Sequence, residues 1–583
     1  MLAAQGTDHN AALPLIELGM TAIAFAASFA WPRLGSALFT RIERMFRRLA
    51  RRQGLAVLLV GSSVFLLRLA ILPLYPIPLP FVPDDFSFLL AADTFAHGRL
   101  ANPTPAMWIH FESMHISMQP TYMSMYFPAQ GLLLAAGKVF LGHPWFGALI
   151  ASALMCSAIC WMLQAWLPPS WALLGGFIAV LRIALFSYWT NTYHASGSLT
   201  ALAGALVLGA LPRLTRTAQS RYGLIMGVGI VMLVLSRPYE GLLLCIPVGV
   251  ALGHWALFGK NRPSPQVLLR KAAAPLAIIL AGIAWLGYYD YRAFGSPTTL
   301  PYTVNRAQYA LAPYYVWQSQ RPEPSYRFEV MRRFYHKEEL EFFTKIHSPA
   351  GFIPQTFLKG LLTFEFYAGF ILLLPLIMIH RVFRDRRIRF LVACVLVMTA
   401  GLLIEIYLLP HYVALVACAF YAIGLQCLRH LRFWKPGGQT VGLTLVRLIV
   451  TVCVVLAGIR MYAQPLHIAA PEWPPSSWNF TWFGPEHYGV ERARVEAQLG
   501  QLPGGQLAIV RYAPDHQLFD EWVYNSADID GSKVVWAREM DETNNLKLIE
   551  YYGSRKAWLV EPDAVPARVT PFSIPAVSTT ALH

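Results

Sequence analysis

Apolar residues gather along this chain in runs of about 20, the length that crosses the hydrocarbon core of a bilayer. Lipid offers the backbone no hydrogen-bond partners, and the runs are too long for strands, so we expect membrane-spanning helices. The first run has no basic region before it and no clear cleavage motif, which favours a signal anchor or an extra helix over a cleaved signal. The twelve runs fall near residues 11–31, 54–76, 144–165, 170–187, 197–212, 222–236, 241–258, 272–292, 360–380, 389–408, 412–428 and 440–462.

The loops between these runs alternate in basic charge. Lys and Arg cluster in loops 32–53, 213–221, 260–271, 381–389 and 429–435, whereas the short loops 188–196 and 409–411 contain none. The positive-inside rule places the basic loops in the cytoplasm. Twelve spans with both termini outside fit every short loop.

This topology predicts three parts. Residues 1–53 form an extra N-terminal helix and a basic cytoplasmic loop, and residues 54–462 form the main membrane domain. Residues 463–583 form a soluble extracytoplasmic domain. Two long outer loops, 77–143 and 293–359, are expected on the same side as that soluble domain.

Composition agrees with a membrane protein, because 56% of the residues are hydrophobic, only 14% are charged and the mean hydropathy is +0.45. The net charge of +15 does not indicate nucleic-acid binding, since most of it lies in short loops between apolar runs. Residues 463–583 carry nine Lys and Arg against fifteen Asp and Glu. All seven cysteines lie in apolar runs, so we expect no disulfide framework in the soluble part.

Shorter elements are predicted outside the membrane runs. The apolar segment 127–141 is short for a membrane span, contains Lys138 and is associated with a proline, which together favour an interfacial helix. Residues 84–98 favour another short helix. The C-terminal part begins with an aromatic, Pro-rich linker at 471–485 and ends in a Ser/Thr/Pro-rich stretch that we expect to be disordered. Between them we predict a small α/β unit with helices at 486–499 and 517–525 and strands at 506–512, 533–539 and 557–561.

The adjacent carboxylates Asp84 and Asp85 stand out, a few residues beyond the outward end of the second run. They could cap the helix that follows, or they could serve chemistry. The same loop holds His97, His110, His115 and Glu112, which keeps a divalent metal possible, although no helical metal-binding spacing occurs. No cofactor is certain.

At these residues the chain resembles the GT-C superfamily of membrane glycosyltransferases, which includes protein O-mannosyltransferases and the lipid A aminoarabinose transferase. The resemblance covers residues 54–462. It rests on a first long helix followed by an outer loop that opens with an acidic pair, and on three short motifs: Asp84-Asp85-Phe86 with Ala96-His97-Gly98-Arg99-Leu100, Tyr126-Phe127-Pro128-Ala129-Gln130-Gly131, and Leu409-Pro410-His411-Tyr412.

The resemblance implies that Asp84 is a general base. The family usually has Asp-Glu where this chain has Asp84-Asp85, so the role of Asp85 is open. Many relatives carry a later acidic residue, but residues 188–198 contain none here. His194 could substitute for it or could be structural.

Other side chains are candidates for substrate contact. A lipid phosphate leaving group needs fixed positive charge, which Arg237, Arg306 or His411 could supply, although Arg237 could instead pair with Glu240. Ionisable residues inside apolar runs are functional candidates, and Arg182 and Glu405 could pair or line one cavity. Glu112 or Asp85 could orient the acceptor.

We therefore predict a polytopic membrane glycosyltransferase in the cell (inner) membrane. It would move a sugar from a polyprenyl-phosphate donor to a hydroxyl of a lipid, glycan or protein acceptor on the extracytoplasmic side, with inversion. The alternatives are a secondary transporter or flippase, which would favour acids and broken helices near the midplane of two related halves, and a non-catalytic membrane scaffold.

Overall fold

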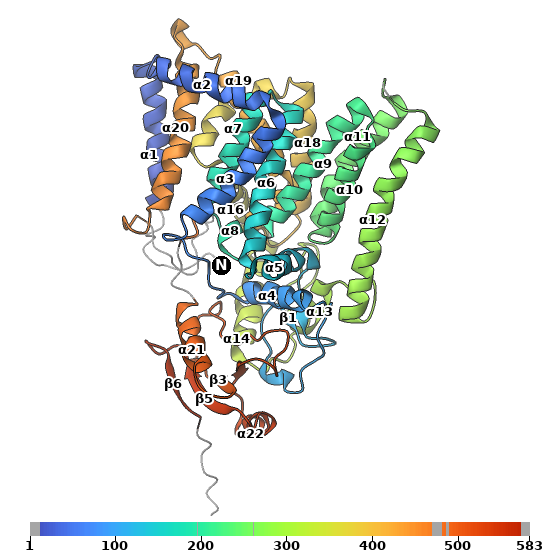
Figure 1. The fold of residues 1–583 in the computed structure, drawn as a ribbon, viewed down its shortest axis with the longest axis vertical. Helices are drawn as coiled ribbons and strands as arrows, with labels where there is room; N and C mark the ends of the chain where they lie inside the picture. Colours follow the sequence, from blue (N-terminus) through green and yellow to red (C-terminus); the bar gives the residue numbers. More distant parts are fainter. Residues whose placement is uncertain (1–11, 195, 261, 469–480, 485–488, 573–583) are drawn as a thin grey trace, which may run out of the picture.

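A helical bundle and a small α/β domain stand end to end in the computed structural model (Figure 1), which describes residues 12–194, 196–260, 262–468, 481–484 and 489–572. The predicted fold class is confirmed. The predicted linker 471–485 lies almost wholly outside the described residues, and so does the C-terminal stretch from residue 573 that was expected to be disordered.

Every predicted apolar run falls on a helix of the bundle. These helices are α1 (Ala12–Ala30), α3 (Gln53–Ala70), α6 (Trp145–Trp166), α7 (Pro169–Ala179), α9 (Gly197–Thr217), α10 (Ser220–Val234), α11 (Pro238–Phe258), α12 (Pro265–Phe294), α16 (Pro349–Ala368), α18 (Arg386–Leu402), α19 (Ala417–Leu431) and α20 (Val441–Met461). Among the described residues, eight helices are long and apolar enough to span a membrane. A ninth span results if α16 and the helix after it, bent by 100°, count as one. The expected count of about twelve exceeds the nine spans that length and composition support, because α7, α10 and α18 have only 11, 15 and 17 residues.

Proline sets where many helices begin. Each of α7, α11, α12 and α16 starts with a proline, as do the shorter α4 (Pro83–Ala96), α5 (Pro128–Leu141) and α13 (Pro301–Tyr309). A proline suits the first helical position because its fixed φ matches the helix and its missing N–H would have no partner there. The predicted short helix at 84–98 and the predicted helix at 127–141 are thus present as α4 and α5.

The other helical segments are short. They are α2 (Ser36–Arg51), α8 (Tyr188–Asn191), α14 (Glu329–Arg332), α15 (Leu340–His347), α17 (Ile379–Val382), η2 (Trp108–His110), η3 (Val180–Ala184), η4 (Arg333–Glu339), η5 (Ile371–Met378), η6 (Pro410–Tyr412), η7 (Ala414–Val416) and η8 (Pro436–Gly438). At Gly204 of α9 the backbone approaches η7 so closely that a Cβ atom would lie 1.9 Å from the Leu415 carbonyl oxygen. This close packing fixes η6 and η7 against the bundle.

An ion network inside the bundle joins helices that are distant in sequence. Arg182, in the π-helical turn η3, donates to Glu17 of α1 and to Glu365 of α16, in both cases over 2.8 Å. Arg460 of α20 lies 3.4 Å from Glu17. All four side chains are buried. Arg182 is thus bound to partners other than Glu405, with which it could have paired or lined one cavity.

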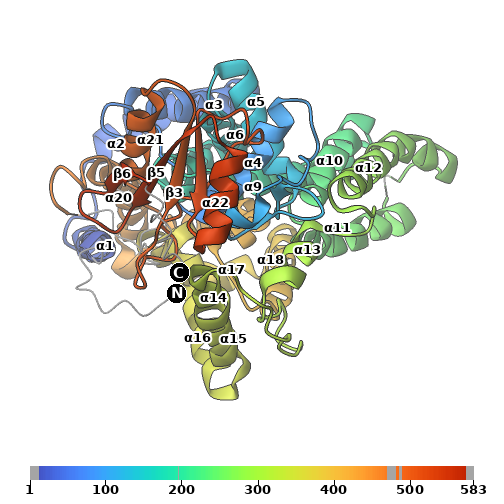
Figure 2. The ribbon, with the colours of Figure 1, turned by 90° about the horizontal axis from the view of Figure 1, so that it is seen from below.

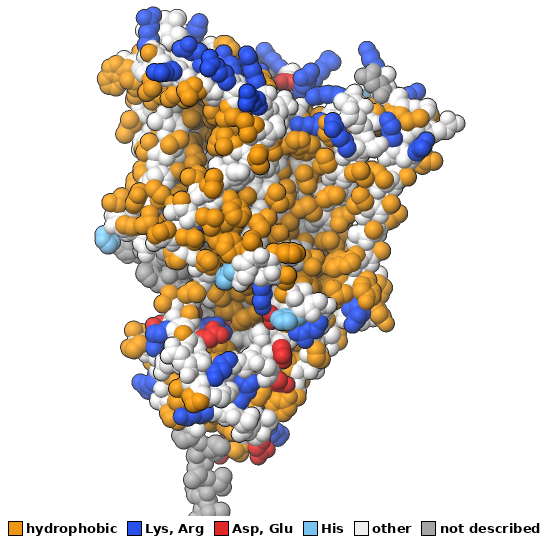
Figure 3. Space-filling view, in the orientation of Figure 1, with side chains coloured by type: hydrophobic (Ala, Val, Ile, Leu, Met, Phe, Trp, Pro, Cys, Tyr) orange, Lys and Arg blue, Asp and Glu red, His pale blue; other side chains and the backbone are white. Residues whose placement is uncertain are grey.

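Basic side chains gather at the end of the bundle away from the C-terminal domain. Figure 3 shows Lys and Arg there, above a broad apolar surface. Amphipathic α2 lies across this end, with Glu43 bound to Arg447 of α20 over 2.8 Å. The predicted basic loops therefore share one end of the molecule, and the outer loops and the C-terminal domain share the other.

The C-terminal domain is an α/β unit with a four-stranded sheet in the order β4-β3-β5-β6. Strand β3 (Gln506–Val510) pairs in parallel with β4 (Val534–Arg538) and β5 (Lys556–Glu561), and β6 (Arg568–Pro571) is antiparallel to β5. Figure 2 shows α21 (Val490–Gly500) and α22 (Glu542–Tyr551) flanking the sheet. The strands were predicted, except β6, and α22 was missed.

The predicted helix at 517–525 is wrong. Several of its backbone groups bond to distant partners: Glu521 N–H donates to the Phe81 carbonyl, and the Trp522 and Tyr524 carbonyls accept from Arg492. Tertiary contacts thus override the local helical pattern in this segment.

The domain shares a hydrophobic core with the first outer loop. Leu507, Ile509, Val535 and Ala537 of the sheet belong to one buried cluster with residues of loop 77–143, namely Leu90, Phe111, Ile116, Met118 and Tyr122; part of that loop forms a small hairpin of β1 (Ile116–Ser117) and β2 (Met123–Ser124). Polar contacts reinforce the junction, since Ser113 donates to Glu521 over 2.9 Å and Arg538 donates to the Glu112 carbonyl. The domain is therefore docked on the loop that carries the acidic pair.

Candidate active site

The acidic pair lies in the first turn of α4. Val82 occupies the N-cap position without a side-chain capping bond, and Pro83 is the first helical residue, so neither Asp84 nor Asp85 is the cap. The capping alternative is thereby removed. The partial positive charge of the helix start favours carboxylates at these positions.

Two side chains hold the Asp84 carboxylate. The Tyr126 hydroxyl donates to one oxygen, and His115 Nδ1 lies 3.2 Å from the other. Burial alone would raise the pKa of Asp84, but His115, His194 and Tyr126 outweigh it and hold that pKa far below its ordinary value. The Asp84 side chain remains 30% exposed. It is thus an ionised carboxylate that a substrate can reach.

The backbone of His115 adopts a left-handed conformation with φ of 62°. A non-glycine residue there costs about 1–2 kcal/mol. Its carbonyl is fixed by the Ser87 hydroxyl at 2.6 Å and by the Met125 amide at 3.1 Å. These bonds hold the ring beside Asp84.

Asp85 points the other way, into the turn before α9. Its Oδ1 accepts from the Tyr193 amide (2.9 Å), the His194 amide (3.1 Å) and His194 Nδ1 (2.8 Å), and the side chain is 1% exposed. Burial would lower the pKa of His194, but Asp85 and then Asp84 outweigh that effect and raise it above its usual value. Asp85 therefore holds His194, which keeps a part-exposed ring near Asp84.

His411, in η6, closes the other side of this cluster. The Tyr188 hydroxyl lies 2.8 Å from His411 Nδ1 and accepts from the His411 amide at 3.2 Å. Burial, and then the positive charges of Arg237 and His194, lower the pKa of His411 well below its ordinary value. Its imidazole is thus neutral.

Arg237 immediately precedes α11 and supplies a fixed cation. It donates to Glu240 over 2.6 Å and lies 4.0 Å above the ring of Tyr412. The alternative pairing with Glu240 is therefore present, and it uses one nitrogen only. Within the described part of the chain the buried Nε of Arg237 has no hydrogen-bond partner, which leaves donor capacity for an anion.

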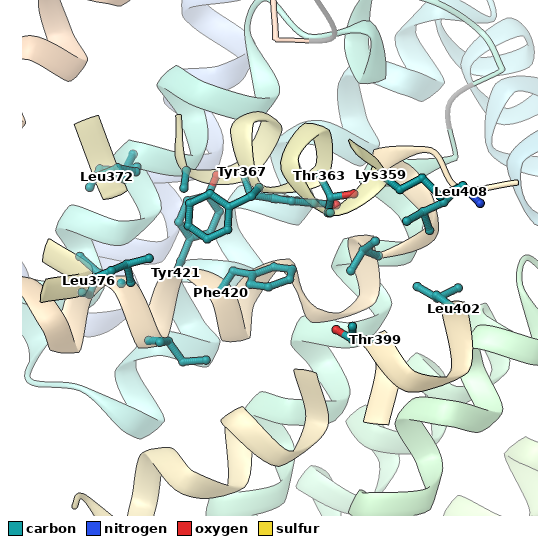
Figure 4. Close-up of a pocket in the computed structure, with 18 of the residues that line it drawn as sticks. Lys359, Thr363, Tyr367, Leu372, Leu376, Thr399, Leu402, Leu408, Phe420 and Tyr421 are labelled. Atoms are coloured by element: carbon teal, nitrogen blue, oxygen red, sulfur yellow. The ribbon is translucent and has the colours of Figure 1, made fainter. Parts of the chain in front are cut away.

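An apolar pocket of about 330 Å³ adjoins the cluster inside the bundle (Figure 4). Helices α16, α18 and α19 and η5 line it, with Lys359, Thr363, Tyr367, Phe420 and Leu408 among its walls. The Tyr367 hydroxyl donates to the Pro410 carbonyl over 2.7 Å, next to His411. Tyr367 thus joins the wall of the pocket to Pro410, the residue that precedes His411 of the polar cluster.

Lys359 stands where this pocket borders residues 405–408. Its ammonium group donates to the carbonyls of Glu405 and Ile406. The Glu405 carboxylate is close enough to Arg237, Glu240 and Lys359 to interact electrostatically with all three. Glu405 therefore belongs to the rim of the cationic site.

The structure brings Asp84, Asp85, His194, His411 and Arg237 together, but three predicted site residues lie outside this cluster. Arg306 bonds to Glu339 over 2.8 Å and to the Ala312 carbonyl. It lies over the ring of Tyr314, which in turn contacts the ring of Tyr302. Glu112 is bound by Tyr309 and Arg327. Arg182 belongs to the ion network of the bundle.

Among the described residues, no three His, Cys, Asp or Glu side chains are grouped so that they could hold a metal ion. Glu112 is already bound to Arg327, and His110 Nδ1 lies 3.0 Å from the Arg538 carbonyl. The metal site considered from His97, His110, His115 and Glu112 is therefore not formed.

Sequence reasoning missed three contributors. His115 was weighed only as a metal ligand, Tyr126 entered only through a family motif, and Lys359 was not singled out. The position of Tyr126 directly before the Phe127-Pro128 helix start was the one available signal.

The chain is thus a multi-pass membrane protein with a polar cluster at one end of its bundle. No protein-family model matches its sequence, and no curated protein sequence matches it. Its structure is similar to the Archaeoglobus fulgidus oligosaccharyltransferase tethered with an acceptor peptide (11% identity, TM-score 0.46, 87% of this chain and 68% of that chain). It is also similar to ArnT from Cupriavidus metallidurans in the apo state (12%, 0.45, 87% and 92%) and to archaeal oligosaccharyltransferase AglB in complex with an inhibitory peptide and a dolichol-phosphate (12%, 0.42, 87% and 69%).

Proposed function

We propose that this protein is a membrane glycosyltransferase that moves a sugar from a polyprenyl-phosphate donor to an acceptor hydroxyl on the extracytoplasmic side. The observation that carries the proposal is a sequence of three environments side by side. An apolar pocket inside the bundle includes Tyr367, which bonds to the Pro410 carbonyl next to His411, and His411 is close enough to interact electrostatically with both the buried cation Arg237 and the reachable ionised carboxylate Asp84. A lipid-linked phosphate sugar needs these three environments in that order.

In this reaction the acceptor oxygen attacks the anomeric carbon as its proton passes to Asp84. The bond between the anomeric carbon and the phosphate oxygen breaks, and its electron pair stays on the phosphate. Arg237 stabilises the charge that develops there, with its free Nε as donor. A single displacement of this kind inverts the anomeric centre.

The donor tail would lie in the pocket between α16, α18 and α19. Its walls are mainly apolar, and Thr363 and Lys359 mark a polar end. Lys359, which shares Glu405 with Arg237 as an electrostatic neighbour, would be a second cation for the phosphate. Arg306 and Glu112, bound to other loop residues, would act on the acceptor only after those partners move.

The orientation follows from charge. The basic loops lie at the end of the bundle opposite the acidic pair, and basic loops face the cytoplasm. The C-terminal domain would then sit outside the cell membrane, docked on the loop that carries Asp84, where it could recognise the acceptor.

The test is incubation of the purified protein with a panel of polyprenyl-phosphate sugars and acceptor mixtures, comparing Asp84→Asn with the unchanged protein. We expect release of polyprenyl phosphate and labelled acceptor, and a loss of about a hundredfold or more in Asp84→Asn, the scale of general base catalysis. His97→Gln, on an exposed side chain outside the cluster, is the control. Transfer at the unchanged rate by correctly folded Asp84→Asn would exclude this mechanism, and movement of the intact lipid sugar across the bilayer without transfer would favour a flippase.

A further inference from the structure

A second acid–base group lies beside Asp84 and has no part in the displacement described above. The Asp85 carboxylate and the His194 ring form a dyad, joined over 2.8 Å. Asp85 is 1% exposed, so it cannot touch a substrate, whereas the His194 side chain is 21% exposed. Asp85 is therefore a positioning residue, and His194 is the member that faces the site.

The dyad fixes which nitrogen of His194 is available. Asp85 Oδ1 accepts from Nδ1 of the ring and also from the backbone amides of Tyr193 and His194, so one oxygen holds both the ring and the backbone that carries it. Nε2 makes no hydrogen bond to the described residues. A carboxylate on Nδ1 that leaves Nε2 for chemistry is the arrangement by which a histidine is oriented for proton transfer.

The place of His194 in the cluster limits its role. It interacts electrostatically with Asp84 and with His411, and His411 also interacts with Arg237. His194 is thus a neighbour of the carboxylate that would receive the acceptor proton, and His411 connects it to the cation that would hold the phosphate.

We propose that His194 is a proton shuttle that hands a proton from Nε2 to the departing phosphate oxygen and is then reprotonated by Asp84. This inference rests on the proposed glycosyl transfer. One proton leaves the acceptor oxygen for Asp84, one leaves His194 for the phosphate as the bond to the anomeric carbon breaks, and the proton on Asp84 then passes to His194. The sum is one proton moved from acceptor to phosphate.

Neighbouring groups are poorly suited to this task. Arg237 does not give up its proton in proteins. His411 is neutral, and its Nδ1 is already met by the Tyr188 hydroxyl. Asp84 binds a proton weakly, because His115 and Tyr126 stabilise its carboxylate. The second ionisation of a phosphate monoester lies near pH 6, about that of a histidine, so the transfer between them is close to balanced.

The charges around His194 keep it ready to donate. Asp84 and Asp85 face it from α4, His411 faces it from η6, and the Tyr188 ring of α8 lies 6.2 Å away. Two carboxylates outweigh one neutral imidazole, which favours the protonated ring. As pH rises through its pKa the donor is lost, so turnover should fall on the alkaline side.

The test is the pH dependence of kcat with a polyprenyl-phosphate sugar as donor, for the unchanged protein, His194→Gln, Asp85→Asn and the control His97→Gln. We expect His194→Gln to lower kcat about a hundredfold, the lower end for general acid–base catalysis, to remove the alkaline limb and to leave the donor KM unchanged. Asp85→Asn should move the limb to lower pH, because it removes the carboxylate that favours the protonated ring.

Each result decides between the claims. An alkaline limb that persists in folded His194→Gln, or a defect confined to KM, overturns the shuttle and leaves the proposed transfer standing. If His194→Gln does not fold in a thermal unfolding assay, the limb of Asp85→Asn decides, and an unshifted limb overturns the shuttle. Absence of sugar transfer by the unchanged protein, or full transfer by Asp84→Asn, overturns the proposed function itself.

Discussion

Tyr126→Phe should change the base strength of Asp84 without changing its position. The Tyr126 hydroxyl is one of two donors on this carboxylate, and its ring stacks on Phe88 with centroids 4.3 Å apart, so phenylalanine keeps the packing. A hydrogen bond to a charged group is worth about 1.5–3 kcal/mol, which corresponds to a pKa rise of about one to two units.

The pKa of Asp84 is held low in the folded protein, so loss of the donor raises it and moves the acid limb of activity to higher pH. The assay is kcat/KM against pH, which reports the groups of the free enzyme. Tyr309→Phe is the matched control, because it removes a hydroxyl from another buried carboxylate, Glu112, and should leave the limb in place. If the acid limb of kcat/KM in Tyr126→Phe has an unchanged midpoint, or a midpoint at lower pH, Asp84 is refuted as the titrating base.

Three further changes test other parts of the structure. Arg237→Gln should lower kcat/KM for the donor roughly ten- to a hundredfold through loss of about 1.5–3 kcal/mol of stabilisation of the phosphate charge, and an unchanged kcat/KM would remove Arg237 from the phosphate site. Arg182→Met should lower the free energy of unfolding in detergent by about 3–5 kcal/mol because it leaves buried carboxylates uncompensated, whereas unchanged unfolding would show that the network contributes little. Burial would raise the pKa of Glu521, but Arg538 and the hydrogen-bond donors around Glu521 outweigh that effect and lower the pKa. The stability that ionised Glu521 contributes is therefore present above its unfolded pKa and is lost as pH falls through its folded pKa. The protection factors of the β3 and β4 amides in hydrogen exchange should therefore fall on acidification, and Glu521→Gln should weaken that dependence.

Periodicity and loop charge were enough to place the helices and the acidic pair. Runs of about 20 apolar residues admit only one kind of structure in lipid, and Pro83 and Pro128 mark helix starts that any reader of the sequence can find. His411 and Arg237 could be placed at outer helix ends for the same reason. The alternating basic loops gather at one end of the molecule, as the expected topology requires.

Partners across the fold could not be read in this way. Arg182 bonds to Glu17, which lies 165 residues away, and nothing in either local sequence names the other. Segment 517–525 has a helical pattern, yet its backbone is used by Phe81 and Arg492. Tyr126 and His115 became visible as contacts of Asp84 only when their loop was folded over α4.

The ion network also bears on how the protein is made. Glu17 is translated early, but Arg182 follows 165 residues later and Arg460 follows 443 residues later. A lone acid is unfavourable in an inserting helix, by about 2.5–3.5 kcal/mol at the centre on translocon scales, and Glu17 lies in the second turn of α1. The bonds of Glu17 can therefore form only after Arg182 of η3, and later Arg460 of α20, have been made, so the network joins α1 to α16 and α20 only late in synthesis.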